Sequence, residues 1–304
     1  MSSRNRRRTN RRGRISVADV AVMVVIATIV LFFLLMALPR GREHARSAAC
    51  TRNMGRIGVA LAVFDQIQGK LPVVGVPPGL DDPGAVAPPA PLRTIIDVLK
   101  LPDFSALSDP SNPPQPQPDR VPGERIMPDF LCPSDRGTTA GVHPAPTSYR
   151  ACTGDVHSGR NGVFALGREL SLARVQEIDG VSFKAAFAER LVGDGQPRPS
   201  VENYLVVPRL PSDARPDPAA ARGDAGGRWT VADYRYTLYN HELAPGASPS
   251  LIAADGKSAL MGASSSHERG VNVLFCDGRV DVVRPTVDQT LWRRLGRVEL
   301  EQHD

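Results

Sequence analysis

The chain has 304 residues and a formal net charge of +5. Seven arginines lie in the first 14 residues, so residues 15–304 together carry a net charge of −2. Because the basic charge is confined to one short tail, the sequence predicts no nucleic-acid-binding face. The remainder is long enough for one large domain or two small ones.

Residues 20–38 contain no charged side chain, and Thr28 is their only polar residue. At 1.5 Å per residue, a helix of this length spans about 28 Å, close to the hydrocarbon thickness of a bilayer. The sequence that follows, from Ala37 to Arg42, matches a signal-peptidase site poorly. We therefore predict a retained transmembrane helix over residues 15–38, after a basic leader over residues 1–14.

The arginines before this segment outnumber those after it, where Glu43 also reduces the positive charge. The positive-inside rule then predicts a single-pass protein of the inner (cytoplasmic) membrane. Its N-terminus would lie in the cytoplasm and its larger part in the periplasm or outside the cell. The lipid bilayer is accordingly the first predicted partner.

Residues 39–70 predict an amphipathic helix, which we call the stalk. Its apolar residues recur at helical spacing: Cys50, Met54, Ile57, Leu61 and Phe64. Gly69 and Pro72 then predict the end of the helix. Two arrangements fit this pattern: a separate helix after a hinge at Pro39, or one long helix that lies half in lipid and half on a globular head.

The predicted head, residues 71–304, is α+β. Two proline-containing stretches, about 72–128 and 208–227, predict loops, apart from a short helix over residues 92–101. Strands are predicted at residues 162–166, 204–207 and 235–239, and helices at 183–191 and 289–300. Two β-rich runs joined by Asp277-Gly278 predict a hairpin with a type I′ turn.

Four cysteines lie in the part predicted to be exported, where disulfides form. Cys132 and Cys152 flank a short loop and are the first choice for a pair, while buried free thiols remain the alternative. No C-x-x-C motif occurs and the histidines are scattered, so we predict no metal site and no cofactor.

Several segments resemble known families. Residues 42–61, which include Cys50-Thr51-Arg52-Asn53-Met54, resemble the start of the bacterial family called domain of unknown function 1559. That family resembles type IV pilins and pseudopilins at its N-terminus. The resemblance implies a pilin-like fold, with a long, partly transmembrane N-terminal helix packed on an antiparallel β-sheet head.

The same register places the prepilin processing site at Gly13, Arg14 and Ile15, and the pilin helix acid at Asp19. A prepilin peptidase is the implied processing partner. Here Arg14 replaces the usual glycine, and Gly13 lies one residue earlier. Whether the leader is cleaved is therefore left open.

Further segments carry the resemblance through the head. His267, nine intervening residues, then Asp277 and Gly278 resemble the family's H-x9-DG element within residues 267–283. Residues 130–135 resemble its Cys-Pro-Ser-Asp block, and Thr147 to Gly154 resemble the block that follows. Residues 178–190, which end in Glu189-Arg190, resemble another.

His267 and Asp277 alone do not make a catalytic site, and the sequence shows no third ligand or nucleophile at a recognisable spacing. We therefore predict a non-enzymatic, membrane-anchored, pilin-like structural or interaction protein that self-associates through its N-terminal helix. The alternative is an uncleaved surface protein whose exported head binds a ligand or partner.

Overall fold

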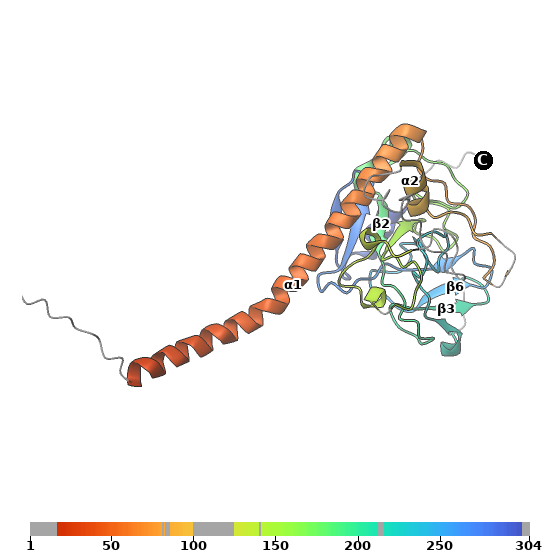
Figure 1. Ribbon diagram of the computed structural model, residues 1–304. Helices are drawn as coiled ribbons and strands as arrows, with labels where there is room; N and C mark the ends of the chain where they lie inside the picture. The colour runs from red at the N-terminus through yellow and green to blue at the C-terminus, as the bar shows by residue number, and fades with distance from the viewer. Residues whose placement is uncertain are drawn as a thin grey trace, which may run out of the picture. The chain divides into compact units, whose positions relative to one another are not determined.

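A computed structural model describes residues 17–80, 82, 86–99, 125–139, 141–211 and 216–299, with only the backbone given for residues 34–40, 97–99 and 138–139 (Figure 1). Its contacts form two units, Met1–Ala45 and Arg46–Asp304. The predicted leader and the whole predicted processing site, Gly13, Arg14 and Ile15, lie outside the described residues.

Figure 1 labels five of the described helices and strands: α1, α2, β2, β3 and β6. The α-helices are α1 (Val17–Gln68), α2 (Pro91–Leu99), α4 (Leu172–Ile178) and α5 (Gln289–Gly296). The 3-10 helices are η2 (Pro128–Phe130), η3 (Arg136–Thr139), η4 (Val181–Phe183) and η5 (Pro218–Ala220). The strands are β1 (Tyr149–Cys152), β2 (Ala185–Glu189), β3 (Tyr204–Val207), β4 (Ala221–Arg222), β5 (Leu238–Tyr239), β6 (Ser250–Ala253), β7 (Ala259–Leu260), β8 (Val271–Phe275) and β9 (Val280–Val283).

These strands form two sheets. The larger has the order β5-β1-β2-β8-β9, and the smaller has the order β4-β3-β6-β7. Each sheet is mixed, because β5 runs parallel to β1 and β6 runs parallel to β3, while the other pairs are antiparallel. Both parallel pairs join strands that lie far apart in the chain, as crossover connections require.

The predicted fold, a partly transmembrane helix packed on an antiparallel sheet, is therefore wrong in two respects. The head is α+β, but both of its sheets are mixed. Among the residues that the structure describes, none of the helices combines the length and the apolar sequence needed to cross a bilayer.

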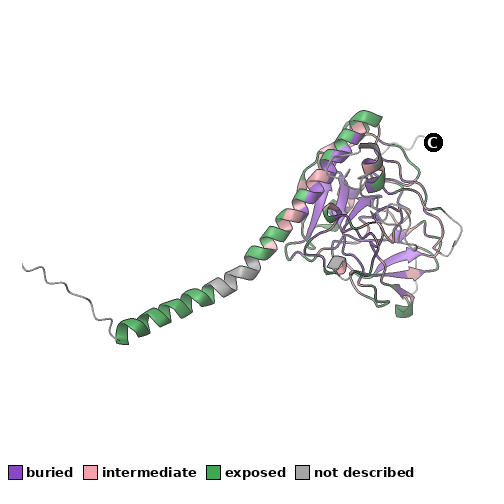
Figure 2. Ribbon diagram, in the orientation of Figure 1, coloured by how far each residue is buried: buried purple, intermediate pink, exposed green. Residues whose placement is uncertain are grey.

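The stalk prediction is confirmed within the second unit. All five residues of its apolar stripe are buried, from Cys50 at 0% to Phe64 at 5% exposure, whereas residues 17–33 of the same helix are exposed (Figure 2). Helix α1 continues past Pro39 without a break and ends at Gln68. Gly69 then takes a positive φ of 68°, and its N–H donates to the carbonyl of Asp65.

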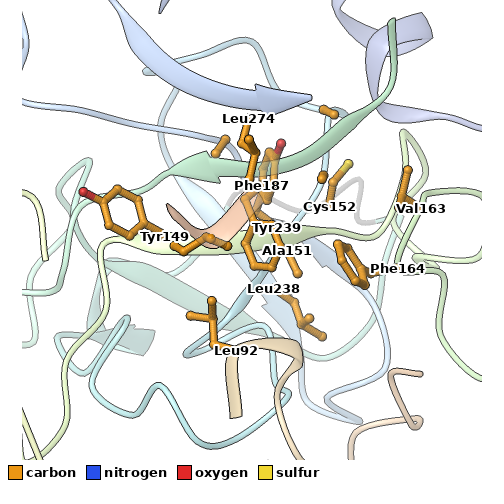
Figure 3. Packing of buried hydrophobic residues seen from close by; sticks show 14 of the residues in the cluster. Leu92, Tyr149, Ala151, Cys152, Val163, Phe164, Phe187, Leu238, Tyr239 and Leu274 are labelled. Carbon is orange, nitrogen blue, oxygen red and sulfur yellow. The ribbon is translucent and has the colours of Figure 1, made fainter. Parts of the chain in front are cut away.

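The stripe packs into the same core as the larger sheet. Tyr149, Phe187 and Leu274, from the neighbouring strands β1, β2 and β8, contribute side chains to this core (Figure 3). On α1, Gly58 allows the close approach of β8, because a Cβ atom there would lie 2.9 Å from the Leu274 side chain. Helix α1 thus packs directly against β8.

This contact predicts opposite effects for two glycines of the same helix. Gly58→Leu should lower the free energy of unfolding by about 1–3 kcal/mol, because the added side chain overpacks the contact with Leu274. Gly55→Leu should raise it by roughly 0.5–1 kcal/mol, because open space surrounds Gly55 and leucine favours a helix. Urea unfolding measures both changes, and equal effects at the two positions would contradict this packing.

Several local predictions need correction. Residues 183–191 do not form a helix: β2 occupies Ala185–Glu189, and all five of its residues are buried between β1 and β8. Tertiary pairing here outweighs the helix preference of alanine. Residues 162–166 form turns, and the strand predicted over residues 235–239 shrinks to β5, because N–H groups there donate to Asp233. The predicted loop over residues 208–227 contains the edge strand β4.

The late hairpin is confirmed, but its turn differs from the prediction. The register pairs Leu274 with Val280, and the Phe275 N–H donates to the carbonyl of Arg279. The loop therefore has three residues, and Gly278 at its end has a φ of 86°. A three-residue loop that ends in a left-handed glycine replaces the type I′ turn, since it too matches the strand twist.

A buried cystine, histidine and glutamate

Four side chains of potential ligand type meet beside α1, and we call them the four-residue cluster: Cys50, Cys132, Glu189 and His267. Helix α1 carries Cys50, the segment after η2 carries Cys132, β2 ends at Glu189, and the loop before β8 carries His267. Their ligand atoms all lie within 4.8 Å of one another, and all four residues are buried. Four distant segments thus converge on one small polar site.

Cys50 and Cys132 form a disulfide with a Cα–Cα distance of 5.1 Å, across 82 positions of the sequence. The predicted Cys132–Cys152 pair is therefore wrong, because the sulfur of Cys132 is already bonded to a residue of α1. Cys152 and Cys276 are buried free thiols, the alternative that the sequence left open. Burial raises the pKa of the Cys152 thiol to about 12, which keeps it protonated and unreactive.

His267 lies against both the disulfide and the carboxylate. Its Nε2 atom is 3.4 Å from the Cys132 Sγ atom and 3.4 Å from the Glu189 Oε1 atom. Its backbone N–H donates to the Ser265 hydroxyl at 3.2 Å, which shapes the loop that carries it. The ring therefore faces into the head.

Glu189 is held in a fixed orientation by the neighbouring strand. Its Oε2 atom accepts a hydrogen bond from the backbone N–H of Asn272 at 3.0 Å, and its Oε1 atom accepts one from the Asn272 side-chain amide at 2.9 Å. Asn272 lies on β8 and is 1% exposed. These two bonds compensate part of the cost of burying a carboxylate.

The Cys-Pro-Ser-Asp segment is fixed by a second carboxylate. The Asp135 Oδ2 atom accepts hydrogen bonds from the Ser148 hydroxyl at 2.8 Å and from the Val192 N–H at 3.0 Å. The Ser148 hydroxyl in turn accepts from the Cys132 N–H at 3.1 Å. Burial raises the pKa of Asp135 to about 6, despite these bonds.

The three predicted motif residues have different surroundings. His267 belongs to the four-residue cluster, whereas Asp277 and Gly278 form the hairpin turn. The Asp277 Oδ1 atom accepts a hydrogen bond from the Arg279 N–H at 3.0 Å. Asp277 therefore shapes the turn, as the sequence predicted. Asp19 lies in the first turn of α1 and is exposed.

Sequence reasoning missed Glu189 and the pairing of Cys50 as parts of this site. The signal for both was present, because each of the four residues lies in a segment that carries the family resemblance. The prediction of no metal site relied on short ligand spacings, and these four residues are spread over more than two hundred positions. Only the fold brings them together.

This geometry defines a class of protein: an α+β head of two mixed sheets, with a cystine, a histidine and a glutamate buried beside its first helix. Residues 39–290 match the family described as "Protein of unknown function (DUF1559)", so the chain belongs to that family. No curated protein matches the chain, and no solved structure does either.

Loss of the disulfide should destabilise the head. Cys50→Ser should lower the free energy of unfolding by about 2–5 kcal/mol, because the cross-link no longer restricts the unfolded chain. Urea unfolding with and without a reductant provides the measurement and its control. The reductant should destabilise the wild type and leave the variant unchanged, whereas an equal response of both proteins would contradict the assignment.

The buried Asp135 predicts a pH dependence of stability. Its folded pKa of about 6 lies above the ordinary value of 3.8, so its stabilising contribution is full below pH ~4 and is lost as the pH rises through 6. The loss amounts to about 3 kcal/mol. Asp135→Asn removes this titration, so wild type should lose about that much stability relative to the variant between pH 4 and 7. A difference that stays constant with pH would contradict the prediction.

Proposed function

We propose that this protein is a non-enzymatic interaction protein, held at the cytoplasmic membrane by its N-terminal apolar segment, with its head outside the cytoplasm. The observation that carries the proposal is the exposed apolar surface of the first unit. Eleven large hydrophobic side chains between residues 20 and 33 are 47–65% exposed: Val20, Val22, Met23, Val24, Val25, Ile26, Ile29, Val30, Leu31, Phe32 and Phe33. A continuous apolar surface of this kind marks a site that is buried in a membrane or against another protein.

Charge and redox chemistry support the proposed orientation. The seven arginines precede the apolar segment, which favours a cytoplasmic N-terminus. Both cysteines of the Cys50–Cys132 disulfide come after the apolar segment in the sequence. Structural disulfides persist in oxidising compartments. Both observations support the proposal that the head lies on the exported side.

Burial supports a non-enzymatic role. The four-residue cluster is the best candidate for chemistry among the described residues, and its members are only 0–9% exposed. A disulfide occupies both of its sulfur atoms, and the small hollow whose lining includes Cys132, Glu189 and four serines provides little room for a substrate. This enclosure supports a structural role for the cluster.

Membrane attachment is tested by fractionation. The full-length protein should stay with the membrane pellet after alkaline carbonate extraction. Val24→Lys combined with Ile29→Lys should release it, because the charges disfavour burial in lipid. The paired control, Val59→Lys with Ile67→Lys, changes exposed residues of α1 within the head unit and should leave attachment unchanged. A wild-type protein that carbonate extracts fully would overturn the proposal.

The pilin resemblance of the N-terminus adds self-association through the same residues. Leu31→Cys should form disulfide-linked dimers on mild oxidation in native membranes. Val59→Cys, which is also exposed on α1 but lies in the head unit, should remain monomeric. If both variants remain monomeric, the self-association proposal is wrong. The protein would then be an anchored head that acts through another partner.

A further inference from the structure

The four-residue cluster contains the donor atoms of a zinc site. Two sulfur atoms, an imidazole nitrogen and a carboxylate oxygen lie within 4.8 Å of one another. Tetrahedral Zn²⁺ has metal–ligand distances of about 2.0–2.3 Å, which places neighbouring ligand atoms roughly 3.3–3.8 Å apart. The His267 Nε2 atom already lies 3.4 Å from both the Cys132 Sγ atom and the Glu189 Oε1 atom.

The structure shows the oxidised form of the cluster, in which the two sulfur atoms bond to each other. Reduction would supply two thiolates in the same place, because the backbone holds both cysteines near the other two ligands. We propose that the reduced head binds one Zn²⁺ through Cys50, Cys132, Glu189 and His267, and that oxidation to the disulfide releases the ion.

The redox step balances as a thiol–disulfide exchange. An external disulfide accepts two electrons from the two zinc-bound thiolates, and the products are the Cys50–Cys132 bond, free Zn²⁺ and two external thiolates. An external dithiol drives the reverse reaction: it is oxidised to its own disulfide, its two protons pass to the solvent, and the two cysteines become thiolates that bind the ion.

The surroundings of the cluster fit a closed structural site. Asn272 donates two hydrogen bonds to the Glu189 carboxylate and thereby orients it, as outer-shell residues do around bound metals. Ser148 accepts the Cys132 N–H and fixes the backbone of that ligand. Four protein ligands and strong burial leave no open coordination position, so the ion would stabilise the head rather than catalyse a reaction.

Sulfur ligands favour zinc over calcium and magnesium. The latter two ions prefer sets of oxygen ligands and higher coordination numbers. Two thiolates, one imidazole and one carboxylate instead suit a small tetrahedral site for a borderline-soft ion. Cobalt(II) adopts the same geometry in such sites and is coloured, so it serves as a spectroscopic probe.

The test uses the full-length chain in detergent micelles, freed of metal with a chelator. One sample is reduced with a phosphine under anaerobic conditions and the other is left oxidised. After addition of Zn²⁺ and removal of the excess, metal analysis should find one zinc per reduced chain and none per oxidised chain. Adding an external disulfide to the reduced, loaded chain should release the zinc.

Ligand variants show which residues hold the ion. Glu189→Gln and His267→Ala should each weaken zinc binding at least about 100-fold in competition with a chromophoric chelator, because ligand loss costs no less than loss of an outer-shell partner. His157→Ala removes a half-exposed histidine outside the cluster and should bind zinc as the wild type does. His267→Cys should restore binding, which separates ligand loss from misfolding.

Co²⁺ added to the reduced wild type should give thiolate-to-cobalt charge-transfer absorption and the visible bands of a tetrahedral site. Three results would each overturn the proposal. The first is that the reduced wild type binds no zinc, in either its folded or its unfolded state. Binding that survives both Glu189→Gln and His267→Ala is the second, and equal binding by the oxidised and reduced chains is the third.

Discussion

The burial of one face of α1 against the larger sheet is the constraint on which the rest of the head depends. The stripe from Cys50 to Phe64 enters the same core as β1, β2 and β8. Gly58 lets the helix approach β8 so closely that a Cβ atom at this position would meet the Leu274 side chain. This approach also brings Cys50 within bonding distance of Cys132, so apolar packing and the polar site share one origin.

The polar site is stable because each charged or polar member has a fixed neighbour. Asn272 holds Glu189, and Asp135 acts through Ser148 on the backbone of Cys132. Arg190, the residue after Glu189, is fully buried and donates to the carbonyl oxygens of Gly262 and Asn203. The end of β2, in the larger sheet, is thus hydrogen-bonded to segments next to β3 and β7 of the smaller sheet, and a change in one of these residues should affect the others.

The sequence predicted what depends on local periodicity. The α1 stripe, the end of that helix at Gln68, α5 and the β8–β9 hairpin all follow from spacings of apolar residues and from glycine positions. The prediction for β2 was wrong, because an alanine-rich segment has a high helix propensity. Pairing with the neighbouring strands makes this segment a strand instead. Proximity in sequence also suggested the wrong cysteine pair, since only the fold shows that α1 passes beside Cys132.

The position of β8 in the larger sheet has a consequence for how the chain is made. This strand lies between β2 and β9, yet it begins at Val271, whereas β2 already ends at Glu189. The stalk, β1 and β2 leave the ribosome well before the strand that covers them. Their apolar faces stay open until β8 has been synthesised, and transiently exposed apolar surface of this kind makes a chain prone to aggregation. A premature stop before β8 would therefore give an aggregation-prone fragment rather than a smaller folded head.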